Sequence, residues 1–180
     1  MPPRHVSRGG EYVRVAGVDW TDPLDGSYSM ARGGRWNAPG AFPIVYLCAT
    51  KGVARAYLSR KYHGFPYSVD EFAPGAGPDL VTTSVPHATV VDVVTPAGCT
   101  AAGLPQTYPL DATGHEVPWP PCQTLGQRWW TAGEPGIACP SATLVTQEGR
   151  PQSAGEELAW FQRGILPMTA RVAFDAWFWP

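Results

Sequence analysis

The stretch Gly34-Arg35-Trp36-Asn37-Ala38-Pro39-Gly40 stands shortly before the apolar run Ile44-Val45-Tyr46-Leu47-Cys48. The pair Pro39-Gly40 favours a type II turn, in which glycine takes the position that needs a positive φ. The apolar run has the length and composition of a buried strand. Together the two pieces predict a turn over 35–40 that leads into a buried strand over 44–48.

The segments on either side of this pair have contrasting patterns. Downstream, Thr50 is a candidate N-cap, and apolar residues recur at helical spacing from Val53 to Tyr62, which predicts an amphipathic helix. Upstream, residues 11–18 predict a first strand with Arg14 on one face. Residues 17–34 hold Asp, Pro, Ser and Gly at turn-favouring positions and predict a loop.

The rest of the chain mixes strands and helices without a regular alternation. The prolines of residues 98–121 exclude a long helix or a central strand there, so a long irregular connection is expected. The other expected elements are strands over 80–85, 89–94, 137–145 and 168–179, a short helix over 124–131, and a loop over 146–158. Because no βαβ repeat is present, the predicted fold class is α+β rather than doubly wound.

Length and composition indicate one globular domain over residues 1–180. With 180 residues, of which 44% are hydrophobic, the chain can bury one core and is too short for two ordinary domains. The formal net charge is −2, and no Lys/Arg cluster of the kind that neutralises nucleic-acid phosphates occurs. We therefore expect no nucleic-acid partner.

Signals for membranes, export and metals are not found in this sequence. The longest apolar runs have strand length, far below the roughly 20 residues of a membrane span, and the first residues lack the apolar core of a signal peptide. We expect no membrane association and a cytoplasmic location. The four cysteines and four histidines show no short ligand spacing, so free buried thiols and no metal site are expected.

Several motifs follow one another along the chain: Tyr12-Val13-Arg14-Val15, Gly34-Arg35-Trp36-Asn37-x-x-Gly40 with Val45-Tyr46-Leu47, Thr124-Leu125-Gly126-x-x-Trp129, Cys139-Pro140-Ser141-Ala142 and Phe174-Asp175. In this order they resemble the RES domain, a bacterial family of NAD+-degrading toxins related to ADP-ribosyltransferases. The resemblance runs over almost the whole chain. It implies a single ADP-ribosyltransferase-like domain, with a mixed, mostly antiparallel central sheet and short flanking helices. It also implies NAD+ as substrate or ligand, no metal, and a cognate antitoxin protein as a candidate partner.

The functional set of the family is matched in part. In that family an arginine after the glycine, a tyrosine on the next strand, a glutamate in the following helix and a serine act together. Arg35, Tyr46 and Ser141 match the first, second and fourth. The helix position of the glutamate falls at or next to Tyr57, and the predicted helix contains no acidic residue. The asparagine-proline-x-histidine stretch that usually follows the serine is absent, so the chain is a divergent member by this pattern.

The chemistry that the resemblance implies gives each residue a candidate role. Arg35 would bind the diphosphate of NAD+ through charge-assisted hydrogen bonds, with Arg14 as a second phosphate ligand. Tyr46 would stack on the nicotinamide ring, and Ser141 would hydrogen-bond the ribose or the carboxamide. Trp36 would wall the pocket. Each residue type also has an ordinary structural role, which stays open here: a bracing or salt-bridging arginine, a core aromatic, and a turn-forming Pro-Ser pair.

The missing acid has several candidate replacements. Cleavage of the nicotinamide–ribose bond places positive charge on the sugar, which a carboxylate would stabilise. Glu156-Glu157 lies just beyond the serine, and Asp70-Glu71 lies just beyond the helix. Of these, Glu157 is the predicted catalytic acid, although a solvated loop charge is the ordinary interpretation for each. Tyr57 would supply a hydrogen bond, but a neutral phenol cannot offset the cation as a carboxylate does.

Three functional hypotheses follow. The first is an NAD+-consuming enzyme that cleaves the nicotinamide–ribose bond as a glycohydrolase, a phosphorylase or an ADP-ribosyl transferase. The second is a degenerate member that binds NAD+ or a related nucleotide without cleaving it, and the third is an enzyme of a specialised pathway that uses the same pocket on another substrate. Because the helix glutamate is absent, slow or altered chemistry is expected.

Overall fold

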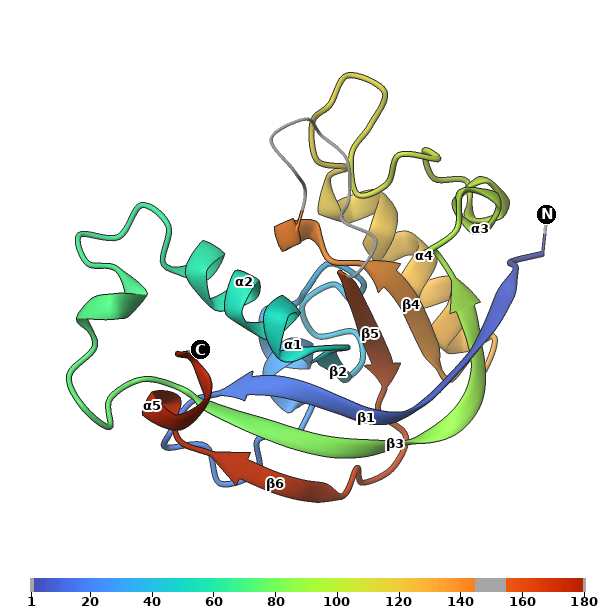
Figure 1. Cartoon of the computed structure of the whole chain (residues 1–180). Helices are drawn as coiled ribbons and strands as arrows, with labels where there is room; N and C mark the ends of the chain where they lie inside the picture. The colour runs from blue at the N-terminus through green and yellow to red at the C-terminus, as the bar shows by residue number, and fades with distance from the viewer. Residues whose placement is uncertain (1, 145–154, 180) are drawn as a thin grey trace.

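A six-stranded sheet forms the centre of the molecule, in a computed structural model that describes residues 2–144 and 155–179. The strand order is β1-β2-β5-β4-β3-β6, and β1 pairs with β3 as well, so five of the strands form a closed ring of pairings (Figure 1). In the described residues every pairing is antiparallel except that of β3 with β4. The strands are β1 (His5–Ala16), β2 (Ile44–Cys48), β3 (Asp79–Asp92), β4 (Gly136–Pro140), β5 (Glu156–Phe161) and β6 (Met168–Val172).

Short helices flank this sheet. They are α1 (Ser27–Arg32), α2 (Lys51–Lys61), α3 (Pro96–Ala102), α4 (Trp119–Thr131) and α5 (Phe174–Trp177), with single 3₁₀ turns η1 (Val69–Glu71) and η2 (Ala142–Leu144). The arrangement confirms the α+β class and the mixed, mostly antiparallel sheet with short helices. Within the two described ranges no helix is long and apolar enough to cross a membrane.

The pair of elements that follows the Pro39-Gly40 turn has the predicted form. β2 has the predicted bounds of 44–48, and α2 begins directly after Thr50. The Thr50 Oγ1 accepts a hydrogen bond from the backbone N–H of Val53 at 3.2 Å, which is the N-cap contact that the sequence indicates. The residues within and directly next to β2 and α2 are thus sufficient to predict both elements.

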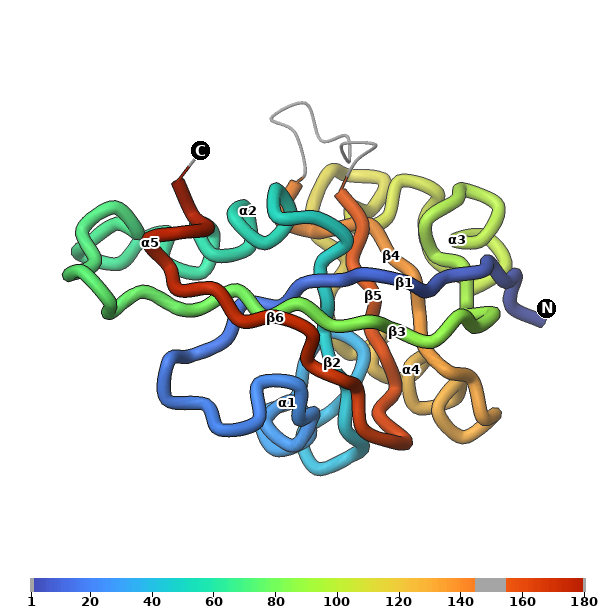
Figure 2. Tube along the Cα trace, turned by 60° about the horizontal axis from the view of Figure 1, so that its bottom comes forward, coloured from blue at the N-terminus to red at the C-terminus, as the bar shows by residue number. Residues whose placement is uncertain are grey.

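The two strands predicted over 80–85 and 89–94 are one continuous strand, β3, which includes Pro86. A proline cannot donate a backbone hydrogen bond, and strands tolerate it where the ladder is irregular. The register of β1 with β3 shifts between Arg8 and Gly10, opposite Pro86, so a β-bulge accommodates the proline. Gly10 has a φ of 90°, as such a bulge requires. β1 consequently starts at His5, earlier than predicted, and Figure 2 shows β1, β3 and β6 running side by side.

Helices occupy parts of two segments that were predicted to be irregular. α1 lies inside the predicted loop 17–34, and most of α3 and the start of α4 lie inside 98–121. Pro96 of α3 and Pro120 and Pro121 of α4 do not prevent this, because they stand in the first turns of the helices, where a backbone N–H has no partner within the helix.

The C-terminal predictions were also wrong in part. The strand predicted over 137–145 ends at Pro140, and the strand predicted over 168–179 ends at Val172. Phe174 and Trp177 are both buried at a helical spacing in α5, which outweighs the alternation seen in the sequence. β5 occupies the end of the predicted loop 146–158, whose residues 146–154 lie outside the described part of the chain.

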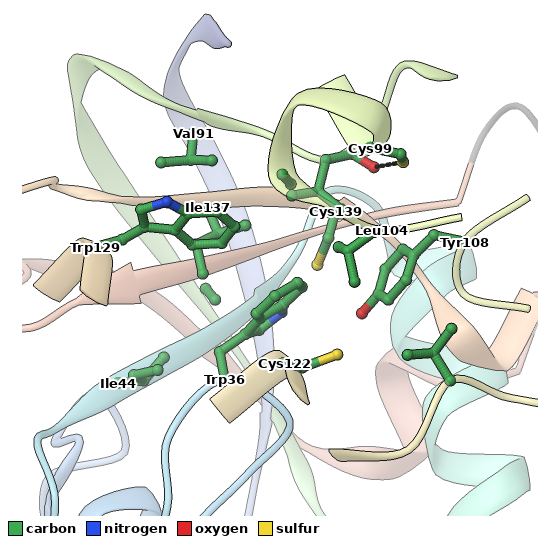
Figure 3. Packing of buried hydrophobic residues seen from close by; sticks show 14 of the residues in the cluster. Trp36, Ile44, Val91, Cys99, Leu104, Tyr108, Cys122, Trp129, Ile137 and Cys139 are labelled. Carbon is green, nitrogen blue, oxygen red and sulfur yellow. Dashed lines mark hydrogen bonds between the residues drawn. The ribbon is translucent and has the colours of Figure 1, made fainter. Parts of the chain in front are cut away.

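The core beside the site is built around Trp36 (Figure 3). The Trp36 ring is fully buried, with its centroid 5.7 Å from that of Tyr108 and 5.8 Å from that of Trp129 on α4. α4 comes this close because of Gly126: a Cβ atom there would lie 1.8 Å from the Trp36 carbonyl oxygen. The free, buried thiols expected from the sequence are confirmed: Cys48, Cys99, Cys122 and Cys139.

We expect Gly126→Ala to lower the free energy of unfolding by about 1–3 kcal/mol, because the added methyl group meets backbone rather than a movable side chain. Gly52→Ala in α2 is the matched control, since a Cβ atom there meets nothing closer than 3.6 Å and alanine has the higher helix propensity. Urea unfolding of both variants measures the difference. Equal stability of Gly126→Ala and the wild type would contradict the close packing of α4 on Trp36.

Candidate functional site

A cavity of about 490 Å³ opens where α2, β1, β2 and β5 meet the segments 28–36 and 116–119. Four basic and two acidic side chains line it, so its formal charge is positive: Arg14, Arg35, Arg60, Lys61, Glu116 and Glu157. Aromatic side chains supply much of the remaining wall: Trp20, Tyr28, Tyr46, Tyr57 and Trp119. A cavity of this size and charge suits an anionic ligand that also carries planar rings.

Tyr46 and Asn37 fix the turn that borders the cavity. The Tyr46 hydroxyl accepts a hydrogen bond from the backbone N–H of Trp36 at 2.9 Å and donates one to Asn37 Oδ1 at 2.9 Å. The Asn37 amide nitrogen in turn donates to the carbonyl oxygens of Ser29 at 2.8 Å and Phe42 at 2.9 Å. Asn37 is fully buried, and these bonds satisfy its amide.

The Tyr46 hydroxyl is therefore engaged within the protein, while the side chain borders the cavity. A Cβ atom at Gly34 would lie 2.5 Å from the Tyr46 hydroxyl oxygen, which is why this position of the motif has no side chain. Burial raises the pKa of Tyr46, so the phenol stays protonated and keeps donating to Asn37.

Arg35 lies between the motif turn and the segment before α4. Its Nη1 donates to the carbonyl oxygen of Val117 at 3.0 Å, and its Nη2 lies 3.3 Å from Glu116 Oε2. The other oxygen of the same carboxylate, Glu116 Oε1, accepts a hydrogen bond from Arg60 Nη2. One carboxylate thus bridges two guanidinium groups at the cavity.

Ser141 holds a carboxyl group on the neighbouring strand. Its Oγ donates to Glu157 Oε1 at 2.5 Å and lies 2.7 Å from Thr143 Oγ1. Burial raises the pKa of Glu157, while the hydrogen bond from Ser141 and the charges of Arg35 and Arg60 act in the opposite direction. The result is a carboxyl group in a positively charged cavity with a pKa above that of an ordinary glutamate.

The two neighbouring glutamates of β5 lie in different surroundings, because successive side chains of a strand point to opposite faces. Glu157 lines the cavity, whereas Glu156 forms a two-point ion pair with Arg8, at 2.5 Å to Nε and 2.9 Å to Nη2. The other candidate acids, Asp70 and Glu71, are in η1 and do not line the cavity. Glu71 instead accepts the backbone N–H of Ser68 in a capping box.

The remaining candidates are distributed between cavity and core. Arg14 borders the cavity, but its Nη1 donates to the carbonyl oxygens of Pro23 at 2.8 Å and Asp25 at 3.2 Å, so it also braces the segment before α1. Tyr57 lines the cavity from α2 and is 40% exposed. Trp36 is among the lining residues, but its buried ring packs with Tyr108 and Trp129 in the core.

Three charged cavity residues were missed by the sequence reasoning: Arg60, Lys61 and Glu116. Arg60 stands three residues after Tyr57 on α2, so helical spacing could have placed both on the face toward the cavity. Glu116 lies in an irregular segment and reaches Arg35 across 81 positions of sequence, for which no local pattern gives a signal. In the residues that the structure describes, no group of three or more His, Cys, Asp or Glu side chains is placed to hold a metal ion.

Comparisons with known proteins connect this cavity to one family. Curated relatives are the proteins named NAD(+) phosphorylase MbcT from Mycobacterium bovis and Mycobacterium tuberculosis, 29% identical over 121 residues, which is 67% of this chain and 62% of theirs. The chain therefore matches less than two thirds of the length of these relatives.

A solved structure has a fold similar to that of this chain. The crystal structure of the M. tuberculosis MbcT–MbcA toxin–antitoxin complex matches with a TM-score of 0.72 at 22% identity, over 97% of this chain and 91% of that chain. The sequence model described as the RES domain matches residues 11–160, a range that includes the Arg35 turn, β2 and both Ser141 and Glu157. By this match, the chain belongs to the RES domain family.

Proposed function

We propose that this protein cleaves the nicotinamide–ribose bond of NAD+, with Glu157 as the carboxylate beside the ribose. The observation that carries the proposal is that Glu157, which accepts a hydrogen bond from Ser141, lines the same cavity as Arg35 and Tyr46. An acid is thus available from β5 although the helix position holds Tyr57. The relatives named NAD(+) phosphorylase support the choice of substrate.

The proposed reaction breaks the bond between the ribose carbon and the nicotinamide nitrogen. Nicotinamide leaves as a neutral molecule with the bonding electrons, and an oxygen atom of the acceptor bonds to the ribose carbon. An ionised Glu157, held by Ser141, would stabilise the positive charge that develops on the sugar. Arg35 would bind the diphosphate, and the Tyr46 side chain would contact the nicotinamide ring.

Phosphate is the acceptor that we propose, because the matching relatives are named phosphorylases. Water or another nucleophile remains the alternative. Nicotinamide release measured with and without inorganic phosphate distinguishes them. A protein antitoxin is proposed as a partner on the ground that the similar fold was solved in a toxin–antitoxin complex.

A second candidate function is binding of NAD+ without cleavage. It is favoured by one observation: Tyr57, on the helix that borders the cavity, stands where the family resemblance places a glutamate. Incubation of the purified protein with NAD+ separates the two functions, because only the enzyme releases nicotinamide.

We expect Glu157→Gln to lower the rate of nicotinamide release by about 100- to 1,000-fold, the effect typical of removing one group that stabilises transition-state charge. Glu156→Gln is the matched control, since it makes the same change one residue away on the opposite face of β5. The rates are measured with saturating NAD+. Similar losses in both variants would count against a specific role of Glu157.

The acid limb of the pH–rate profile should lie above the usual glutamate pKa, because Glu157 must be ionised and burial raises its pKa. Ser141→Ala removes a hydrogen bond that favours the ionised form, so the pKa of Glu157 rises further and the acid limb moves to higher pH. Thr143→Val, which keeps the Ser141–Glu157 bond, serves as control. An acid limb that stays in place in Ser141→Ala would exclude this coupling.

We expect Arg35→Ala to weaken the binding of ADP-ribose tenfold or more, since losing a charge-assisted hydrogen bond costs about 1.5–3 kcal/mol. Arg128→Ala, at an exposed position of α4, removes the same charge away from the cavity. Calorimetric titration gives both affinities. If the two variants bind ADP-ribose equally well, the phosphate-binding role of Arg35 is wrong.

A further inference from the structure

Glu116 is the one acidic side chain of the cavity, besides Glu157, in the described residues, and the reaction proposed above does not use it. Its two carboxylate oxygens have different partners: Oε2 lies 3.3 Å from Arg35 Nη2, and Oε1 accepts a hydrogen bond from Arg60 Nη2. Two arginines on one carboxylate make the same pattern of contacts that they would make on the oxygens of a phosphate group. The carboxylate therefore stands where an anionic ligand would compete with it.

Hydrogen bonds hold the backbone around Glu116 in place, while the Glu116 side chain is partly exposed to solvent. Asp111 Oδ1 accepts the backbone N–H groups of Thr113 at 2.8 Å and His115 at 3.0 Å, and Leu110 forms a β-bridge with Glu116. The side chain of Glu116 is 35% exposed. Rotation of this side chain alone would free Arg35 Nη2 and Arg60 Nη2 for a ligand, while Arg35 Nη1 stays bonded to the Val117 carbonyl oxygen and Arg60 Nη1 to that of Ala142.

The geometry points to Glu116 as an internal competitor of the diphosphate, and thus as a residue that determines which ligands the site accepts. A ligand must carry enough negative charge to displace the carboxylate from Arg35 and Arg60. Neutral nucleosides gain nothing by doing so, because they form no charge-assisted bonds with the two guanidinium groups. The inference rests on the proposed function in one respect, namely that Arg35 meets the diphosphate.

The test is calorimetric titration with inorganic pyrophosphate and with ADP-ribose, which measures binding whether or not NAD+ is cleaved. Glu116→Gln removes the competing charge, and we expect it to bind both probes about three- to tenfold more tightly than the wild type, the range for two partly exposed ion pairs. Its affinity for adenosine should not change. In NAD+ cleavage the same variant should lower KM.

The matched control is Glu134→Gln, which removes the same charge from a glutamate that pairs with His5 at 2.9 Å and does not line the cavity. It should bind pyrophosphate as the wild type does. Glu116→Asp, too short to span both arginines, is a second variant and should also bind more tightly.

Unchanged or weaker pyrophosphate binding in folded Glu116→Gln would overturn the inference and would make Glu116 a brace for the two arginines. An equal gain in Glu134→Gln would overturn it too, because net charge alone would then explain the effect. If pyrophosphate binding strengthens as expected but no nicotinamide is released from NAD+, the inference stands and the proposed catalytic function fails.

Discussion

The cavity depends on the buried contact between Asn37 and Tyr46. One amide group joins the hydroxyl of β2 to the carbonyl oxygens of Ser29 and Phe42, so a single side chain connects α1, the motif turn and the strand. A buried polar group without partners is costly, and here both the nitrogen and the oxygen of the Asn37 amide have partners within the protein. The position of Arg35, two residues before Asn37, follows from this contact. α4 then packs its glycine on the same turn from the other side.

The two acids of the cavity owe their different properties to their neighbours. Glu157 takes a hydrogen bond from a hydroxyl group in a half-buried position, and its pKa is raised because desolvation exceeds the effect of the arginines. Glu116 sits between two guanidinium groups at the more open side. One carboxyl is thereby placed beside the region of the ribose in the proposed reaction, and the other where the phosphates would lie. The same residue type thus serves opposite ends of one proposed ligand.

Local sequence patterns were sufficient for the elements whose residues lie close together in the chain. The Pro39-Gly40 turn, β2 and the Thr50 cap are examples. The family motifs pointed to Arg35 and Tyr46, which line the cavity, and to Ser141, which is buried and holds Glu157. β5 was missed because its first residues are two glutamates, whose burial is decided by pairing with β2 and β4 rather than by alternation. Arg60 was open to prediction from helical spacing. Glu116 was not, since its contacts join distant segments through an irregular connection.

The closed ring of strand pairings can form only after β5 has been synthesised. β2 and β4 share β5 as their neighbour, yet both are synthesised before it. A chain on the ribosome that has not yet reached residue 156 therefore exposes two strand edges, and pairings between such distant segments form slowly. The same late strand carries Glu157. A growing chain of this protein thus lacks Glu157 until every other residue that lines the cavity has been made, so the proposed catalytic acid is the last part of the cavity to be added.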